Sequence, residues 1–411
     1  MKRISLFLLL FLLLKATVMY SQDGHPETNF RIVPVSPNAA SLGTFGMIPT
    51  DNYVGQANLT IPIYEIDLDG KKFPIALSYH TDGTRVAQEA TWIGLGWTLQ
   101  AGGCVVRQVQ GTDDFAARGC YNLTDAPWLT NPRFEVTDQN LEKYMGYFKG
   151  DYDAEPDMFY FNAGGHSGSM YFDVLKNNRQ LNAVPTIQTQ EKVVKMVYNT
   201  SNKTWTMTDL EGYVYSFSTK EITYYFLNTI DFFQTDITRS HIFPYYNEPQ
   251  IVTAWMLDSV TSPNGGKIMF SYKKESIFTP ISTTEDVISL SKIVNGQLSS
   301  QSPQYFTNKF NYNYSYSKIE QWTLSAITFE GGKVEFGTTD REDIESAETG
   351  KKVQKLSSIK VSDTAGNLIK TTMLEYKYLL SGMAATTNGY DDRLFCLLYT
   401  SPSPRDISGS R

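Results

Sequence analysis

A short string around Ser167 is the part of the chain that comes closest to a nucleophile motif. It reads Gly165-His166-Ser167-Gly168-Ser169. Acyl-transfer enzymes that carry a serine on a sharp strand-to-helix turn have glycine two residues before it and two residues after it. Here the second of those positions is occupied by Ser169. We therefore interpret the string as a hairpin turn between strands at Met158–Phe161 and Met170–Phe172, and we expect no catalytic residue in it.

Glycines near two tryptophans are the next candidates, in this case for a dinucleotide site. Gly94 and Gly96 have the first spacing of the dinucleotide-binding fingerprint, but Leu99 stands where its third glycine would be. No strand-helix-strand pattern surrounds them either. We interpret these glycines as points of close backbone packing beside Trp92 and Trp97. No cofactor is predicted.

Histidines that could bind a metal are few. The chain has four, His25, His80, His166 and His241. No two of them share the spacing of a helical or Cys-x-x-Cys-like metal motif, so we predict no zinc site.

An acidic run offers a second kind of metal chemistry. Asp151, Asp153, Glu155 and Asp157 would lie on one face if this stretch were extended. Carboxylate oxygens are the ligands that calcium prefers, but the run lacks the glycine and the ligand order of an EF-hand. The alternative interpretation, and the commoner outcome for such a sequence, is a solvated acidic loop.

Several tryptophans raise the question of sugar binding: Trp128, Trp205, Trp255 and Trp322. A glycoside hydrolase would also need two carboxylates across a cleft, and nothing in the sequence selects such a pair. Trp255 and Trp322 begin two matching blocks of the chain. A position that recurs in repeated blocks indicates packing more than binding.

Cysteines within the predicted fold form a single pair, Cys104 and Cys120. Outside the cytoplasm they could form a disulfide, and closing a loop of about 15 residues would contribute about 3 kcal/mol. The alternative is two buried thiols that do not meet, because the sequence does not place their Cβ atoms.

Strand-turn-strand blocks must position all of these residues. An antiparallel meander is predicted over residues 194–217, and three blocks follow, with turns at Pro263–Gly266, Gly331-Gly332 and, more weakly, Ala365–Asn367. A lone hairpin is marginal in water, so the blocks must lie side by side to bury their apolar faces. We predict a mainly β fold of antiparallel hairpins stacked into a curved sheet or partial β shell, with irregular insertions.

The predicted organisation has four parts. Residues 1–21 form a signal peptide, since a basic start precedes an apolar run that Lys15 interrupts too early for a membrane span. An amino-terminal β domain at 22–190 contains an irregular region at 111–153 with a short helix at 141–148. A strand-turn-strand region at 191–395 has insertions at 222–250 and 287–317, and a tail occupies 396–411.

The tail and the net charge limit the function. Residues 396–411 lose the β alternation and resemble translated sequencing adapter; a linker rich in serine and proline is the alternative. We expect the natural protein to continue beyond Leu394. The net charge of −7 and the scattered Lys and Arg argue against nucleic-acid or anionic-lipid partners. We expect a secreted or cell-surface protein, not inserted in a membrane after cleavage.

Six segments carry a resemblance to a known family: PNAASLG from Pro37, the turn at Ile48-Pro49, SYH from Ser78, WIGLGWTLQAGG from Trp92, EPDMFYFNAGGHSGSMYF from Glu155 and TSPNGGKI from Thr261. Together they resemble the amino-terminal region of the secreted RHS or YD-repeat proteins of Bacteroidota. The GLGWTL string is also similar to the B component of bacterial toxin complexes, which builds a hollow β shell.

This resemblance implies a non-enzymatic shell segment that encloses or displays a carboxy-terminal effector, with the remainder of the same polypeptide as its partner. Cys104, where the family more often has an aliphatic residue, and the absence of well-formed YD repeats depart from the pattern. The resemblance and the repeats mark the following residues as a structural motif: Trp92, Gly94, Gly96, Trp97, Gly102, Gly103, Trp255 and Trp322.

The alternative function is a secreted glycan-binding module or a glycoside hydrolase of β-sandwich type. Strong, tryptophan-dependent binding to one sugar on a glycan array would favour this alternative. A longer reading frame with more strand-turn-strand units would favour the shell.

Overall fold

The computed structural model describes most of the predicted β region. The described residues are 33–47, 58–80, 88–111, 113–116, 119–121, 153, 155–173, 184–188, 194–230, 237–244, 250–290, 293–294, 297–298, 307–379 and 393–397. The expected signal peptide at 1–21 and the short helix at 141–148 lie outside them. The described chain is mainly antiparallel β, as predicted.

A three-stranded sheet forms from the first hairpin and a following strand. It consists of β1 (Asn58–Leu68), β2 (Lys71–His80) and β3 (Trp97–Gln100). Asp69 and Gly70 connect β1 to β2 with positive φ angles of 51° and 91°. Two positive φ values in a two-residue connection are the geometry that matches the twist of a β-hairpin, and an Asp-Gly sequence favours this turn.

A sixteen-stranded sheet contains most of the remaining strands. Its main path runs β21-β20-β18-β17-β10-β12-β4-β5-β6-β7, and six further strands pair along it. The strands of the path not yet defined are β4 (Gly103–Gln108), β5 (Met158–Ala163), β6 (His166–Tyr171), β7 (Thr186–Ile187), β10 (Val214–Ile230), β12 (Ile251–Thr261), β17 (Thr307–Phe329), β18 (Gly332–Asp340), β20 (Gln354–Ser362) and β21 (Leu368–Met373). The six beside it are β8 (Val194–Asn199), β9 (Thr204–Asp209), β11 (Phe243–Pro244), β13 (Lys267–Phe278), β14 (Ser282–Leu290) and β19 (Glu345–Ser346).

The predicted meander and blocks are confirmed as antiparallel neighbours. Strands β8, β9 and β10 pair in order. Strands β12 and β13, β17 and β18, and β20 and β21 form the three predicted hairpins. Period-two alternation between turn residues was a sufficient signal, because hairpin pairing is local along the chain.

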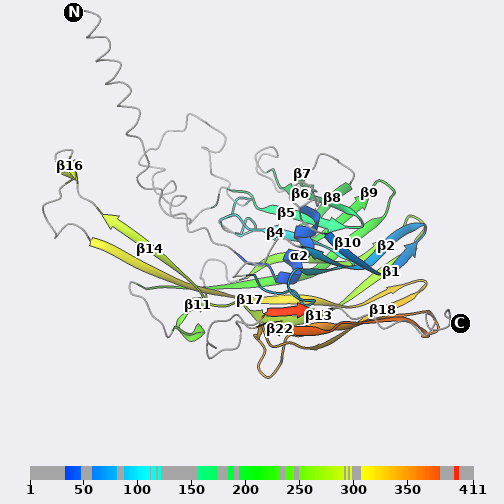
Figure 1. Ribbon diagram of the computed structural model, residues 1–411. Helices are drawn as coiled ribbons and strands as arrows, with labels where there is room; N and C mark the ends of the chain where they lie inside the picture. The colour runs from blue at the N-terminus through cyan, green and yellow to red at the C-terminus, as the bar shows by residue number, and fades with distance from the viewer. Residues whose placement is uncertain are drawn as a thin grey trace, which may run out of the picture.

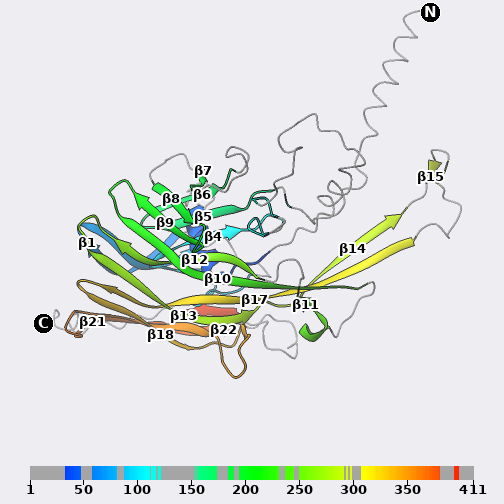
Figure 2. The same ribbon diagram turned by 180° about the vertical axis from the view of Figure 1, so that it is seen from behind.

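Two very long strands occupy much of the two segments that were expected to be irregular insertions. Strand β10 has 17 residues and β17 has 23, so residues 222–230 and 307–317 are regular strand. Strand β14 pairs with the first part of β17, and this arm extends away from the body of the sheet (Figures 1 and 2). A small hairpin of β15 (Ile293–Val294) and β16 (Gln297–Leu298) belongs to the same part of the chain. The prediction of irregular structure was wrong here because strands this long have mixed faces and lose a clear period.

One large apolar core lies between the small sheet and the large one. It includes Ile75 and Leu77 of β2 together with Phe159, Trp205 and Trp255 of the large sheet. One side chain of β21 also reaches the small sheet, since the Lys370 ammonium donates to the Ile63 carbonyl in β1 at 3.1 Å. The two sheets therefore pack around one main apolar core.

A helix and two short elements complete the described structure. Helix α2 (Pro37–Met47) contacts β4 and β5 and was not predicted, since Gly43 and Gly46 are poor helix formers. A 3₁₀ turn, η1 (Arg239–His241), and a hairpin of β22 (Tyr376–Leu379) with β23 (Arg393–Cys396) lie beside the large sheet. In the part of the chain described, no helix has the length and apolar character needed to cross a bilayer.

Candidate functional site

The string around Ser167 lies in a hairpin, as predicted. Gly164 and Gly165 form the turn between β5 and β6, and His166 and Ser167 are successive residues of β6. Successive side chains in a strand point to opposite faces, so the imidazole cannot reach the Ser167 hydroxyl. This geometry does not form a serine nucleophile with a base.

His166 instead belongs to a polar cluster at the tips of three hairpins. The Lys71 ammonium lies 2.5 Å from Asp209 Oδ2 and 3.0 Å from Glu211 Oε2. The Tyr215 hydroxyl donates to Asp209 Oδ2 at 3.1 Å, and His166 Nε2 lies 3.7 Å from the same oxygen. Burial, and then the Lys71 charge, lower the pKa of His166, so the ring is neutral at pH 7. The cluster fastens the tips together through satisfied pairs.

The acidic run contributes to a buried ion-pair cluster. Asp157 is completely buried, Arg107 is 1% exposed, and the Arg107 Nε donates to Asp157 Oδ2 at 2.7 Å. Arg107 also bonds Asp113, and its guanidinium lies 4.7 Å from the centre of the Phe115 ring. The interpretation of this run as a solvated loop was wrong at Asp153 and Asp157, because both side chains are buried. Asp151 lies outside the described residues.

The same cluster bears on the calcium alternative. Within the described ranges, no group of three or more His, Cys, Asp or Glu side chains could hold a metal ion. One signal for this ion pair was overlooked: Arg107 follows Val105 and Val106, and the first five residues of their strand are all buried. A charged residue in such a strand must have an opposite charge beside it.

A buried carboxylate holds helix α2 on the sheet. Glu221 of β10 is fully buried and accepts a bond from the Ser36 backbone N–H at 2.8 Å and another from the Ser36 hydroxyl. The Thr253 hydroxyl donates to the same carboxyl at 3.1 Å. Burial raises the pKa of Glu221, although the bonds from Ser36 and Thr253 oppose the shift. Ser36 in turn caps the helix, since its hydroxyl accepts from the Ala39 N–H at 3.1 Å.

The glycine-rich turn after residue 90 is held by a second buried ion pair. Arg341 bonds both oxygens of Asp343 at 2.8 and 2.7 Å, and both side chains are at most 2% exposed. The same guanidinium donates to the carbonyls of Ala90 and Thr91 at 3.2 and 3.1 Å. The turn is therefore fixed to a segment some 250 residues further along the chain.

Two glycines of the structural motif have no room for a side chain. A Cβ on Gly94, whose φ is +118°, would lie 2.9 Å from the backbone nitrogen of Cys396. A Cβ on Gly103 would lie 2.5 Å from the carbonyl oxygen of Asn162. Close backbone approach explains both glycines.

Cys396, expected to begin the tail, is the last residue of β23, whereas residues 398–411 lie outside the described part of the chain.

The tryptophans that the structure describes are packing residues to different degrees. Trp205 and Trp255 are each 1% exposed, and Trp92 and Trp97 are also buried. Trp322 is half-buried, and its indole N–H donates to the Lys220 carbonyl at 2.7 Å. Fully buried rings cannot stack on a sugar, which removes Trp205 and Trp255 from a glycan site. The described residues do not include Trp128 or His25. Of His80, only the backbone is described.

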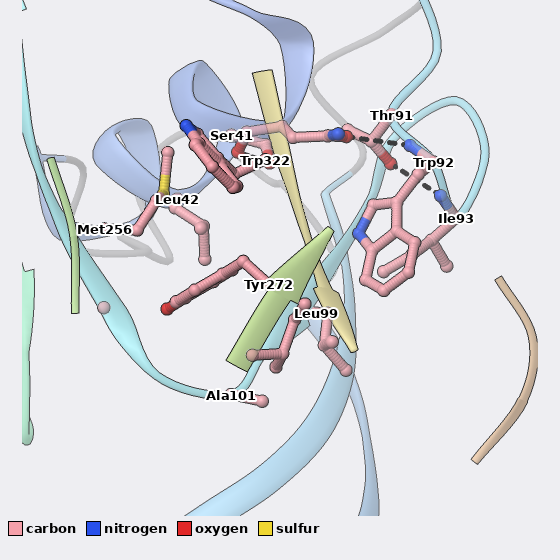
Figure 3. A pocket seen from close by; sticks show the side chains of 13 residues that line it. Ser41, Leu42, Thr91, Trp92, Ile93, Leu99, Ala101, Met256, Tyr272 and Trp322 are labelled. Atoms are coloured by element: carbon pink, nitrogen blue, oxygen red, sulfur yellow. Dashed lines mark hydrogen bonds between the residues drawn. The ribbon is translucent and has the colours of Figure 1, made fainter. Parts of the chain in front are cut away.

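A small pocket lies between α2 and the large sheet (Figure 3). Its cavity volume is about 40 Å³, and its walls include the side chains of Leu42, Trp92, Met256, Tyr272 and Trp322. The polar groups of its walls are occupied: the Tyr272 hydroxyl donates to the Leu257 carbonyl at 2.6 Å, and the Asn38 amide oxygen accepts from the Trp92 N–H at 2.9 Å. No polar group is left here to orient a ligand.

Cys104 and Cys120, the two cysteines considered for a disulfide, are both buried and are not bridged. Burial raises the pKa of Cys104, and burial followed by the charges of Asp114 and Asp153 raises the pKa of Cys120 to about 12. Such thiols are neutral and unreactive at pH 7.

We predict that the unreduced protein, alkylated in denaturant, gains three labels by mass spectrometry, one for each cysteine. Under native conditions Cys104 stays unlabelled, because it is fully buried. A single label in denaturant without reductant would instead show that Cys104 and Cys120 are bridged.

Comparison with known proteins finds weak structural neighbours. No family model matches the chain, and no curated protein matches it in sequence. Among solved structures, a chain of the Photorhabdus luminescens Tc holotoxin pore is similar, with 9% identity and a TM-score of 0.35 over 84% of this chain and 14% of that chain. A chain of the TcdB2-TccC3-Cdc42 crystal structure has 11% identity and a TM-score of 0.31 over 79% of this chain and 14% of that chain. The chain thus spans about a seventh of the length of these toxin-complex chains.

Proposed function

We propose that this chain is a non-enzymatic wall segment of a larger exported polypeptide of the RHS or YD-repeat type. In this role it encloses or displays a carboxy-terminal effector at the cell surface or outside the cell. The chains that it resembles belong to multi-component Tc toxin complexes. The partner of this segment would be the remainder of its own polypeptide.

The observation that carries the proposal is the free end of the sixteen-stranded sheet. Strand β21 ends the strand path and pairs with β20 alone among the described strands. It exposes three apolar side chains: Leu368 is 61% exposed, Met373 41% and Ile369 37%. Apolar side chains on an open edge strand favour pairing with a further strand. A wall that continues beyond this chain would supply one.

Hydrogen exchange tests this proposal once the complete reading frame has been recovered from source DNA and expressed. We expect the longer protein to contain further strand-turn-strand units and to protect the amides of β21 at least tenfold more than this chain does. The central strand β12 is the internal control, because it is paired on both sides in either protein. A reading frame that ends near residue 395 would contradict the proposal of a wall segment. Equal hydrogen exchange of the β21 amides in both proteins would contradict it as well.

A further inference from the structure

Two aspartates from distant parts of the chain bind each other's backbone. The Asp157 N–H donates to Asp114 Oδ2 at 2.6 Å, and the Asp114 N–H donates to Asp157 Oδ2 at 3.4 Å. Both side chains are 0% exposed. Asp114 follows β4 and Asp157 immediately precedes β5, so the pair joins the two ends of the connection between these strands. The Gln110 N–H strengthens this junction by donating to Asp157 Oδ1 at 2.7 Å.

The positive charge in the cluster is directed at only one member of this pair. Arg107 bonds Asp157 through Nε at 2.7 Å and also bonds Asp113. Asp114 makes no ion pair with any described residue, and within the described part of the chain its buried Oδ1 has no hydrogen-bond partner. Two carboxylates held this close in a buried place cannot both remain ionised.

The groups that face Asp114 from the surrounding elements raise its pKa, with two exceptions. Burial, followed by the charge of Asp157, raises the pKa of Asp114 to about 9, and Asp153 adds to this shift; the hydrogen bond from the Asp157 N–H and the charge of Arg107 oppose it. Cys120 and Tyr121 pack beside it, and burial together with Asp114 raises the pKa of each, so both are neutral. The Tyr121 hydroxyl is buried as well, and its interaction with Asp114 adds to the raised pKa of Tyr121.

We propose that Asp114 carries a proton in the folded protein and that this neutral acid closes a proton-dependent clasp with the ionised Asp157 at the base of the β4–β5 connection. Burial raises the pKa of Asp157 as well, but Arg107 and the Gln110 N–H oppose that shift, so Asp157 is the member of the pair that stays ionised. Asp114 can then accept from the Asp157 N–H through one oxygen and hold its proton on the other.

This arrangement makes the stability of the fold depend on pH in a definite direction. Between the ordinary aspartate pKa of about 3.9 and the folded value of about 9, the folded state holds a proton that the unfolded chain has released. The unfolded state binds fewer protons, so stability falls as pH rises through this window. One such proton changes the unfolding equilibrium constant by about tenfold per pH unit.

The test compares Asp114→Asn with Asp157→Asn in the full chain, by urea unfolding from pH 5 to pH 9. Asparagine imitates a neutral aspartic acid, so we expect Asp114→Asn to fold. We also expect its unfolding equilibrium constant to change about tenfold less per pH unit than that of the wild-type protein. Asp157→Asn leaves Arg107 without its main partner, and we expect it to be less stable than wild type at every pH. The proposal would be overturned if the stability of Asp114→Asn kept the pH dependence of the wild-type protein, or if this variant lost as much stability as Asp157→Asn.

Two measurements on the wild-type protein keep the test independent of how the variants fold. Infrared spectroscopy with labelled aspartate should show a protonated carboxyl band at pH 7 that diminishes towards pH 10; a band absent at pH 7 overturns the proposal. Calcium chloride should leave the melting temperature unchanged. A rise in the melting temperature of wild type but not of Asp114→Asn would mean that both carboxylates are ionised around a cation.

Discussion

Replacing Arg107 with methionine is expected to lower the free energy of unfolding by about 3–5 kcal/mol, because it leaves buried carboxylates without their cation. Arg107 is 1% exposed and Asp157 is 0% exposed, so water cannot replace the lost charge. The methionine retains an apolar stem against Phe115, over which the guanidinium lies. The loss is therefore electrostatic more than a loss of packing. Urea unfolding at pH 7 measures it.

Lysine 72 provides a matched control for this experiment. Lys72 pairs with Asp67 at 2.9 Å and Glu65 at 3.3 Å, but all three side chains are more than half exposed. Ion pairs between exposed side chains are screened by water and contribute little, so Lys72→Met should change stability very little. Combining Arg107→Met with Asp157→Asn should cost less than the sum of the two single changes, since it removes both charges. Equal losses of stability in Arg107→Met and Lys72→Met would show that the buried ion pair stabilises the fold no more than the exposed one.

The sequence predicts local pairing well and long-range charge pairing poorly. The Asp69-Gly70 turn and the Pro263–Gly266 turn were predictable because alternation and turn residues act within about ten positions. Arg107 and Asp157 are 50 positions apart, and the residues around each of them do not indicate that the two form a pair. Asp157 was grouped with the acids nearest to it along the chain, whereas the fold gives it a partner on the adjacent strand.

Helix α2 and Glu221 illustrate the same limit. The helix is weak by composition, and its position depends on Ser36 meeting Glu221 from 185 positions away. Glu221 is in period with the buried Tyr215, Phe217 and Thr223 of its strand, but the sequence indicates no partner for a carboxyl group on that face. Only the folded sheet, which brings Thr253 and Ser36 to the same carboxyl, makes its complete burial possible.

Replacing Trp255 with alanine is expected to cost about 3–5 kcal/mol, the range found when a large aromatic side chain is removed from a packed core. Its ring is 1% exposed and lies 6.1 Å from the rings of both Phe159 and Trp205, centre to centre. The indole N–H also donates to the Lys203 carbonyl at 2.8 Å, which alanine would leave unpaired. Urea unfolding and near-ultraviolet circular dichroism measure the effect.

Trp322 is the matched control, because it begins the second repeat block and makes the same kind of bond. Its indole donates to the carbonyl of Lys220 at 2.7 Å, as that of Trp255 does to Lys203. The two residues differ in burial, since Trp322 is half-buried and packs against a smaller cluster. If packing is the shared role, Trp322→Ala should cost clearly less than Trp255→Ala and should leave glycan-array binding unchanged. A Trp322→Ala variant of full stability that abolishes binding to one sugar would instead make this tryptophan a ligand contact and would favour the glycan-binding alternative.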